Sequence, residues 1–418
     1  MTSDILSPEV LRKKKMFILC AGIVIFFMTS MAKVLIPATI FQDLLKTGMD
    51  VNRISSLGAA FLYAYAASQL FMGCFSDRYG GVRILLIGGS LFSLGTITFP
   101  LLGNYYLMLL FRIITGFGAG TIFLGVAKLL GDLFSARFGL ALGIVLLFGY
   151  LGPTTGTVPM VKLVALLGWK AAMIAPGIAA LIPLIFIILL MKGTIKPVIK
   201  GQTFAPLWVM VKNKDIWSLS WACATVYGAY YAMVGQLGQK IFTDLYAFPA
   251  NRAAFCMMIL TIIVAANNMG GNLLLKLVGG RRKTVLVLGV ISSCLGIFLG
   301  KYGFITQSGA VCFVISTLVL AVPAGFFPMF GLVAKELFPP QYMGMSVAFL
   351  NFMAFVFISL YQNVAGYILK GYPPDPETLS FPAAAYSAVY SFFIAGAVIS
   401  LIAVFLVPET KNISSRQE

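Results

Sequence analysis

Hydrophobic residues fall into about twelve stretches along the chain, each long enough to cross a bilayer as an α-helix. A spanning helix needs roughly 20 apolar residues, because each residue adds about 1.5 Å along the helix axis. The pattern therefore predicts an all-α membrane protein with twelve transmembrane helices. The expected spans are residues 16–36, 54–75, 84–102, 106–130, 138–160, 171–191, 217–239, 253–276, 284–302, 308–334, 344–369 and 385–407.

Polar residues divide these spans into two blocks of six. The long internal polar stretch begins after residue 191, and it predicts a cytoplasmic linker with an interfacial helix over 192–216. We expect an N-terminal six-helix bundle over 1–191 and a C-terminal six-helix bundle over 217–418.

Two loop sequences of the first block recur in the second, which indicates an internal pseudo-repeat. Arg83, at the end of GGVR, aligns with Arg282, at the end of GGRR. Two spans later, Asp132 in GDLFSARFG aligns with Glu336 in KELFPPQYMG. A protein with repeated halves can rock one half against the other around a central site, which is the movement that alternating access requires.

Composition supports a membrane protein. The residues are 60% hydrophobic and 10% charged, with a mean hydropathy of +0.96, which is more apolar than a soluble fold can hide. The net charge is +17, but 20 of the 30 lysines and arginines fall in segments that are cytoplasmic if the N-terminus is cytoplasmic. This bias follows the positive-inside rule, so both termini should be cytoplasmic and no nucleic-acid partner is implied.

The inventory of reactive side chains argues against an enzyme. The chain contains no histidine, its six cysteines have no paired spacing, and no carboxylate falls in the middle of a predicted span. We therefore expect no metal, no cofactor and no catalytic residue, and proton transport by a buried carboxylate is disfavoured. Anion exchange, facilitated diffusion or a coupling ion held by carbonyl groups agrees better with this inventory. The expected partners are a small-molecule substrate and the lipid bilayer, and the expected oligomeric state is a monomer.

Four motifs resemble those of the major facilitator superfamily. GCFSDRYGGVR (73–83) is similar to the loop between helices two and three of that superfamily, and RIITGFGAG (112–120) is similar to its fourth-helix pattern. ELFPPQYMG resembles the loop between helices ten and eleven, and PETK resembles the ending after helix twelve. The resemblance implies a secondary active or facilitative transporter, symporter or antiporter, that moves a small organic solute by rocker-switch alternating access. The expected location is a bacterial inner membrane.

The loop motifs also predict a cytoplasmic latch. Asp77 should lie near the N-terminus of helix eleven, where the helix dipole favours an anion and a nearby arginine can pair with the carboxylate. The resemblance implies that this contact holds the cytoplasmic gate closed. In the second half Lys276 replaces the acid, so only the first latch is expected to work. The candidate gating residues are Gly73, Asp77, Arg78, Gly81, Arg83, Asp132 and Glu336.

Two bases fall inside predicted spans, where a charge is stable only if it faces protein or water. Arg112 lies about six residues into helix four, roughly 9 Å deep. The resemblance implies a role for Arg112 in proton or substrate coupling, and an outer-gate salt bridge or snorkelling stays open. Lys33, in helix one, is a natural anchor for an anion in a cavity, and snorkelling to the outer interface is its alternative.

Lys33, the base in helix one, indicates the charge of the substrate. The first half is similar to the organic-anion and organophosphate porter branches of the superfamily, whose members carry such a base, although this chain lacks their arginine in helix seven. An organic anion is therefore the expected substrate. Neutral polar residues on other spans could complete the cavity, although intramembrane amides often only join helices. The candidate substrate-binding residues are Lys33, Arg112, Tyr227, Tyr230, Tyr231, Gln236, Asn267, Tyr361 and Gln362, with Thr154, Thr155, Asn268 and Asn351 as further cavity residues.

GYLGPTTG (149–156) in helix five resembles the Gly-Pro signature of antiporters in the superfamily. The resemblance implies that Gly152 and Gly156 let helices five and eight pack closely, and that Pro153 bends the segment. Phe148 and Thr157 stand where the signature has glycine. The motif therefore keeps an alternative function open, namely efflux of drugs or metabolites by an antiporter of the same superfamily.

Overall fold

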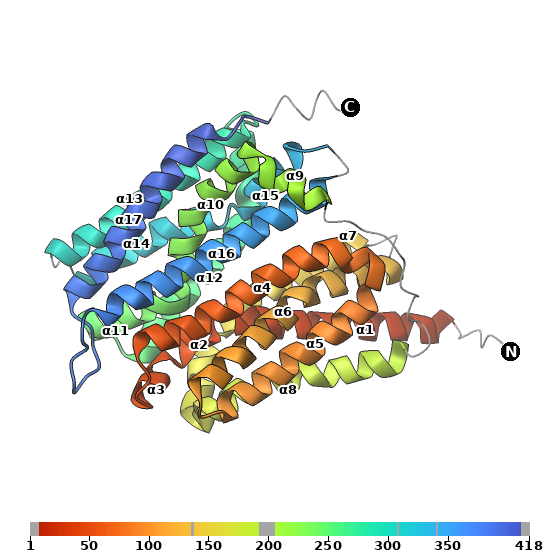
Figure 1. The fold of residues 1–418 in the computed structure, drawn as a ribbon, viewed down its shortest axis with the longest axis horizontal. Coiled ribbons are helices and arrows are strands. Elements are labelled where there is room, and N and C mark those ends of the chain that lie inside the picture. The colour runs from red at the N-terminus through yellow and green to blue at the C-terminus, as the bar shows by residue number, and fades with distance from the viewer. Residues whose placement is uncertain (1–7, 135–137, 192–204, 307–308, 340–341, 411–418) are drawn as a thin grey trace.

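A computed structural model describes residues 8–134, 138–191, 205–306, 309–339 and 342–410 of the chain. Inside those ranges it leaves out the side chains of residues 8–13, 37–38, 73–79, 132, 138–140, 142–143, 146, 150, 191, 205, 269–273 and 344. The described residues form helices and no strand. Figure 1 shows two groups of helices side by side, the red-to-yellow half of the chain against the green-to-blue half.

The described residues of the first half form eight α-helices and one short 3₁₀ helix. They are α1 (Pro8–Ala32), α2 (Leu35–Thr39), α3 (Phe41–Lys46), α4 (Val51–Tyr79), α5 (Gly81–Thr98), η1 (Phe99–Leu101), α6 (Tyr105–Leu133), α7 (Phe138–Thr155) and α8 (Val158–Met191).

The second half follows a short connecting helix, α9 (Ala205–Lys212). Its first span is continuous from α10 through a π-helical turn into α11. The elements are α10 (Lys214–Ala232), η3 (Met233–Leu237), α11 (Gly238–Tyr246), α12 (Ala250–Leu277), α13 (Arg282–Thr306), α14 (Gly309–Ala324), α15 (Phe327–Glu336), α16 (Met343–Lys370) and α17 (Ala383–Leu406).

Local sequence explains where several of these helices begin and turn. The side chains of Asn104 and Asn213 accept hydrogen bonds from the first backbone N–H groups of α6 and α10, which caps both helices. Gly168 divides α8 into two helical parts with φ +78° and ψ 157°, a conformation that is essentially restricted to glycine. The predicted break between spans 138–160 and 171–191 therefore lies inside α8.

Ten helices of the described residues are long and apolar enough to cross a membrane. They confirm ten of the twelve predicted spans. The other two, predicted at 138–160 and 217–239, are also helical: the first is α7 with the start of α8, and the second is α10 with η3. The total of twelve transmembrane helices stays a prediction, while the all-α membrane fold is confirmed.

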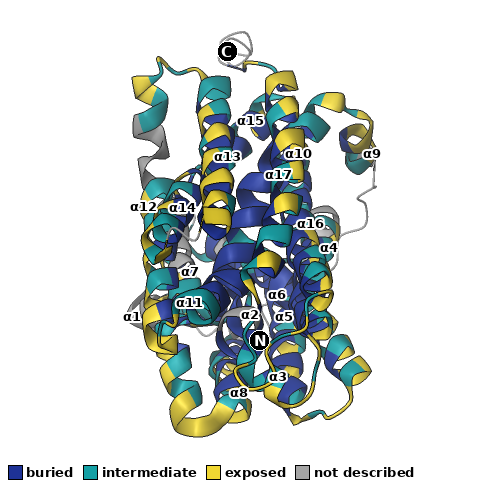
Figure 2. Cartoon of the chain, turned by 90° about the vertical axis from the view of Figure 1, so that its left-hand side faces the viewer, coloured by how far each residue is buried: buried dark blue, intermediate teal, exposed yellow. Residues whose placement is uncertain are grey.

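The outer surface of the bundle is apolar, as a lipid-facing surface must be. Large side chains such as those of Leu166, Val311 and Leu406 are more than 60% exposed. Figure 2 shows exposed residues along the outer sides of the helices and buried residues between them. In water such a surface would aggregate, so the structure requires a bilayer around it.

Small residues set the closest helix contacts within the first half. At Gly88 of α5, an added Cβ would lie 1.8 Å from the Thr121 hydroxyl oxygen of α6, and at Gly118 it would lie 2.5 Å from the backbone of α5. Such approach between α5 and α6 requires glycine, as is usual where membrane helices pack backbone to backbone.

The two halves meet chiefly along α4 and α16, which run antiparallel. Near one end, Gln236 Nε2 donates a hydrogen bond of 2.5 Å to the Ser55 hydroxyl oxygen. Further along the same pair of helices, Asn351 Nδ2 donates to Gln69 Oε1. On the other side of the bundle, α7 contacts α12 through a 2.9 Å hydrogen bond between the hydroxyls of Thr154 and Thr261. A central cavity lies between the two halves beside these bonds, and Gln69 and Asn351 line it.

Candidate functional site

The cavity lies between the two halves and has a volume of about 310 Å³. Its walls come from both halves: α1, α4 and α6 on one side, and α10, α12, α14, α15 and α16 on the other. Most of its surface is aromatic or aliphatic. The polar side chains that line it are Lys33, Tyr65, Gln69, Tyr227, Tyr231, Asn268 and Asn351.

Lys33 carries the charge of this cavity. It lies in the two-residue break between α1 and α2 and is half-buried. Its ammonium nitrogen is 4.5 Å from the centre of the Tyr65 ring and 5.3 Å from the centre of the Phe355 ring. No aspartate or glutamate is among the described residues that line the cavity. The lysine is therefore stabilised by two ring faces and not by a carboxylate.

The two rings under Lys33 belong to different halves of the protein. Tyr65 is on α4 and Phe355 is on α16, and their ring centres are 4.6 Å apart with a 59° angle between the ring planes. Lys33 therefore contacts the seam between the halves. A ligand that pulls the ammonium group away from these rings changes a contact between the halves.

A chain of hydrogen bonds crosses the same seam. Gln69 Nε2 donates to the Tyr65 hydroxyl oxygen at 2.9 Å, and Asn351 Nδ2 donates to Gln69 Oε1. Gln69 is four residues from Tyr65, so both side chains lie on one face of α4. The cavity wall thus connects Lys33 through Tyr65 and Gln69 to the second half.

The opposite wall is supplied by a pair of tyrosines on α10. The Tyr227 hydroxyl donates to the carbonyl oxygen of Ala324 at 3.0 Å, and its ring contacts that of Phe327 with 4.8 Å between centres. Tyr231 stacks on Tyr227 at 6.5 Å. These two of the four predicted tyrosines therefore line the cavity, and so does Asn268, which donates to the carbonyl oxygen of Val264.

Arg112 lies elsewhere. It is 1% exposed, and its Nε donates to the carbonyl oxygen of Leu57 at 3.3 Å. Its guanidinium carbon is 4.5 Å from the centre of the Phe61 ring and 5.6 Å from that of Phe99. All of these partners belong to the first half. The structure thus encloses Arg112 between α4, α6 and η1 and does not bring it to the cavity.

The Nη2 atom of Arg112 has no hydrogen-bond partner among the described atoms. Burying a charge with unfilled donors is costly unless a partner or water supplies the missing bond. The burial of the Arg112 charge, with one donor atom unbonded, therefore carries a free-energy cost in the first half.

The remaining candidate substrate residues are used in contacts outside this cavity. The Tyr361 hydroxyl bonds to that of Thr225 at 2.7 Å, between α16 and α10. Gln362 Nε2 donates to the carbonyl oxygen of Tyr231 at 3.3 Å. Asn267 Nδ2 donates to the carbonyl oxygen of Val322 at 3.2 Å, which ties α12 to α14.

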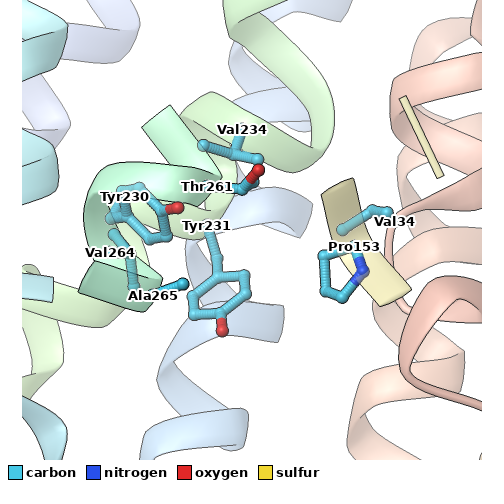
Figure 3. A pocket seen from close by; sticks show the side chains of 8 residues that line it. All are labelled: Val34, Pro153, Tyr230, Tyr231, Val234, Thr261, Val264 and Ala265. Carbon is cyan, nitrogen blue, oxygen red and sulfur yellow. The ribbon is translucent and has the colours of Figure 1, made fainter. Parts of the chain in front are cut away.

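Tyr230 lies in a neighbouring apolar gap of about 30 Å³. Figure 3 shows Val34 and Pro153 on one side of this gap, facing Tyr230 and Tyr231 on the other. Thr155, the other predicted hydroxyl of helix five, donates to the carbonyl oxygen of Leu151 one turn back in its own helix.

Gln236 is in the π-helical turn η3 and is 3% exposed. Besides its bond to Ser55, it lines a small pocket of about 50 Å³ between α3, η3 and α11. Lys240, which also lines this pocket, forms a buried ion pair with Asp244 at 2.5 Å, and Asp244 also accepts from the Tyr386 hydroxyl at 2.6 Å. Gln236 thus joins the halves at the end of the cavity where α4 begins.

The predicted latch falls largely outside the described side chains: Gly73, Asp77, Arg78 and Asp132 are among those the structure leaves out. Gly81 opens α5 against α6, where an added Cβ would lie 2.7 Å from the backbone nitrogen of Leu129. Arg83 lies half-buried in the first turn of α5.

The second half shows how its copy of the loop is held. Arg282 Nη2 lies 3.1 Å from Glu336 Oε1, and this ion pair joins the start of α13 to the end of α15. Thr410 donates from its hydroxyl to the other oxygen of Glu336, and Glu409 accepts from the backbone nitrogen of Arg282 at 3.0 Å. The repeated arginine and acid therefore pair within one half, and Glu409 and Thr410 of the PETK motif bind to them.

The Gly-Pro segment of α7 differs from the sequence expectation. An added Cβ at Gly152 would lie 2.8 Å from the backbone oxygen of Phe27, and one at Gly156 would lie 2.8 Å from Val34. Both glycines therefore face the predicted first span (16–36) and not the predicted eighth span, which is α12. The side of α7 that meets α12 carries Thr154 instead. Pro153 lies inside α7 and lines the gap of Figure 3.

Three residues important to the cavity were missed by sequence reasoning, namely Tyr65, Gln69 and Phe355. A signal was present for two of them: Tyr65 and Gln69 are polar and four residues apart inside a predicted span. A pair of polar residues on one face of a membrane helix indicates a face turned toward protein or water. Phe355 carries no such signal among the 35 phenylalanines of the chain.

The sequence matches the model of the Major Facilitator Superfamily over residues 18–361. It is 26% identical over 135 residues to a probable sulfoacetate transporter, SauU, of Cupriavidus necator, covering 32% of this chain and 31% of that protein. It is 30% identical over 120 residues to the quinolone resistance protein NorA of Staphylococcus aureus, covering 29% of this chain and 30% of NorA. Each alignment thus spans about a third of the relative's length.

Solved structures share the fold over nearly the whole chain. The TM-score is 0.74 to a bacterial homolog of the human lysosomal transporter Spinster, in an inward-facing and unoccupied conformation, over 99% of both chains at 15% identity. It is 0.73 to the nucleoside transporter NupG, over 94% of this chain and 99% of that one at 15% identity. It is 0.71 to a D-xylose-proton symporter, over 95% and 98% at 16% identity. At these identities the likeness shows the fold.

Proposed function

Because the chain belongs to the major facilitator superfamily, whose matched members carry small solutes across membranes, we propose that its solute is a small organic anion and that Lys33 binds the anionic group. The observation that carries this proposal is the charge of the cavity. Among the described residues that line it, Lys33 is the one charged side chain, and it has two aromatic rings as neighbours in place of a carboxylate.

An anion would gain more from Lys33 than from a lysine on a surface. Inside a protein the attraction between opposite charges is several times stronger than in water, because the effective dielectric constant is lower. The ammonium group has already lost part of its hydration, and no acid competes for it. The name of the Cupriavidus necator relative, a probable sulfoacetate transporter, points to the same chemical class.

Transport itself would follow from relative movement of the two halves. Both halves line the cavity, and the bonds Ser55 to Gln236 and Thr154 to Thr261 close it at the end where α4 begins. Breaking these bonds while closing the opposite end would expose the same cavity to the other side of the membrane. The protein would then work by secondary active or facilitated transport with rocker-switch movement.

We also propose the arrangement of the chain in its membrane. Both termini lie in the cytoplasm, residues 1–191 and 217–418 move as two bundles, and 192–216 connects them on the cytoplasmic side. In support, the described start of α1 and the end of α17 lie at the same end of the bundle in Figure 1. The protein works as a monomer in a bacterial cytoplasmic membrane.

A second function is favoured by the walls of the cavity. Phe26, Phe123, Phe327 and Phe355 give it a large aromatic surface, which would also suit amphiphilic drugs, and NorA is a quinolone resistance protein. The two functions make opposite predictions for Lys33. An efflux protein for cationic drugs would gain from losing a positive charge, whereas an anion transporter would lose its anchor.

The test is uptake by proteoliposomes of a panel of labelled monocarboxylates, sulfonates and dicarboxylates, with and without a proton gradient and with unlabelled solute inside. We expect uptake of at least one anion, and a fall of about 100-fold in the Lys33→Gln variant, because a neutral amide cannot pair with the anionic group. Lys33→Arg should keep a substantial fraction of the uptake, since it keeps the charge.

Lys301→Gln is the matched control. Lys301 donates to the Ser391 hydroxyl at 2.6 Å on the outside of the second half, away from the cavity, so its loss should leave uptake unchanged. Uptake of every anion at the wild-type rate by Lys33→Gln would refute the proposal. Faster export of a fluorescent cationic dye by Lys33→Gln, without anion uptake by the wild type, would favour efflux.

A further inference from the structure

We infer that the cavity selects solutes that carry a single negative charge, which rests on the proposed function and narrows its substrate class. The expected ligands are compact monocarboxylates or monosulfonates with an apolar or aromatic body. Dicarboxylates, phosphate monoesters and other dianions of the same size are expected to bind poorly.

The first step of the argument is the number of positive charges. Lys33 is the one base among the described residues that line the cavity. The other base buried in the membrane part of the first half, Arg112, is enclosed by Leu57, Phe61 and Phe99 and has no access to the cavity. One ammonium group can neutralise one anionic group. A second anionic group would be buried without a partner, which is strongly unfavourable.

The second step is what a second anionic group would meet. The neutral amides nearby already use part of their donor capacity: Gln69 donates one hydrogen to Tyr65, Asn351 one to Gln69, and Asn268 one to the carbonyl oxygen of Val264. The amide hydrogens that remain are neutral donors, which compensate a full negative charge less well than a base does. A second anionic group that drew the bonded hydrogen of Asn351 away would break its bond to Gln69, which joins α4 to α16. No base among the described residues that line the cavity can neutralise that group.

The third step concerns the uncharged part of the solute. The remaining walls are mainly ring faces and aliphatic side chains, including Phe26, Phe123, Phe327 and Ile358. The face of an aromatic ring is the negative part of its quadrupole, so it attracts cations and repels anions, while apolar groups gain by packing against it out of water. A body without charge is favoured against these walls. The volume of about 310 Å³ limits that body to a small molecule.

The expected substrate of this chain differs from sulfoacetate, the compound in the name of the relative SauU. Sulfoacetate carries a sulfonate and a carboxylate, so at neutral pH it has two negative charges. The cavity of this chain supplies one compensating charge. Sulfoacetate is therefore expected to be a poor ligand here, while ethanesulfonate, which has the same sulfonate on an apolar body, is expected to bind.

The test uses matched pairs of probes that differ by one charge: benzoate against isophthalate, and ethanesulfonate against sulfoacetate. Binding to the purified full-length protein is read as a rise of the unfolding temperature with ligand concentration, because a ligand that binds the folded state stabilises it. In at least one pair the monoanion should bind about 100-fold more tightly than the dianion. Equal or tighter binding of the dianion in either pair would overturn the inference.

A gain-of-charge variant gives a second, independent measurement. Asn268→Lys adds a base to the cavity wall opposite Lys33, and Asn268→Gln is the neutral control. The lysine variant should bind the dianion of the preferred pair at least about 10-fold more tightly than the wild type does, because the second anionic group then has a partner. The glutamine variant should keep the wild-type preference. A lysine variant that folds and still prefers the monoanion by the wild-type ratio would count against the inference.

The outcomes also distinguish this inference from the proposed function. If Lys33→Gln loses its response to both members of a pair, and the wild type binds both equally, the anion site stands and the single-charge selection falls. If Lys33→Gln responds to every anion as the wild type does, or if no anion stabilises the wild type, the proposed function falls and the selection with it.

Discussion

Two bases of the first half, Arg112 and Lys33, each contact an aromatic ring of α4, and the two rings lie one turn apart. Arg112 lies 4.5 Å from the ring centre of Phe61, and Lys33 lies 4.5 Å from the ring centre of Tyr65. Both rings belong to α4, and they stack on each other at 6.2 Å. Yet Arg112 is enclosed within one half, while Lys33 lines the cavity between the two halves.

The difference lies in the second ring that each base touches. For Arg112 that ring is Phe99, in the same half, so the contact is fixed whatever the halves do. For Lys33 it is Phe355, on α16 of the other half, so the contact depends on how the halves are placed. A charge of the first kind affects stability, and a charge of the second kind can respond to a ligand and to movement.

The largest effect is expected from removing Arg112. Arg112→Ala should lower the free energy of unfolding by about 3 kcal/mol, because it empties a large buried volume beside Phe61 and Phe99. Arg112→Met should lose much less or gain stability, since it fills the space and removes a charge whose Nη2 has no partner. Thermal unfolding in detergent measures both.

Anion binding, unlike stability, should not depend on Arg112, because Arg112 does not line the cavity. In the Arg112→Met protein the ligand-induced rise of the unfolding temperature should equal that of the wild type. If Arg112→Met folds normally but no longer responds to anions, Arg112 acts on the site, and the comparison between the two bases fails.

The next effect concerns the bond between the halves beside Lys33. Gln69→Leu and Asn351→Leu should each destabilise the arrangement of the halves seen in the structure by about 1 kcal/mol. Each substitution leaves the partner amide without the bond that joins α4 to α16. The double variant should cost less than the sum of the two, because the residues share one interaction. Labelling of single cysteines placed in the cavity would report the shift toward open forms. Strictly additive effects would show that the pair does not join the halves.

Much of the fold could be predicted from the sequence because bilayer crossing imposes a simple pattern. Runs of apolar residues located ten spans, and the repeat of Arg83 by Arg282 located equivalent loops. The predicted span 217–239 has lower hydropathy than those ten, because α10 carries serines and tyrosines that contact other helices or the cavity, as Tyr227 contacts α14.

The candidate site was only partly predictable, since helix position gives depth but not direction. Lys33 and Arg112 looked alike in the sequence, and only packing shows which one reaches the cavity. The bond between Gln69 and Asn351 joins residues 282 apart in the chain, so no local pattern could indicate it. Tyr361 is polar and central in its helix, but its hydroxyl bonds to that of Thr225 on α10 and does not line the cavity.

The smallest expected effect is on the stability of a Lys33→Met protein without ligand. Methionine keeps the length and the contact with Tyr65 and Phe355, while the lost cation–π attraction of about 1 kcal/mol is offset by removing a half-buried charge. The unfolding temperature without ligand should therefore stay close to that of the wild type, although the response to anions is lost. A large destabilisation would place Lys33 with Arg112 as a structural base. An unchanged protein that ignores anions would instead separate the two bases by function, although the rings that they contact lie one turn apart on α4.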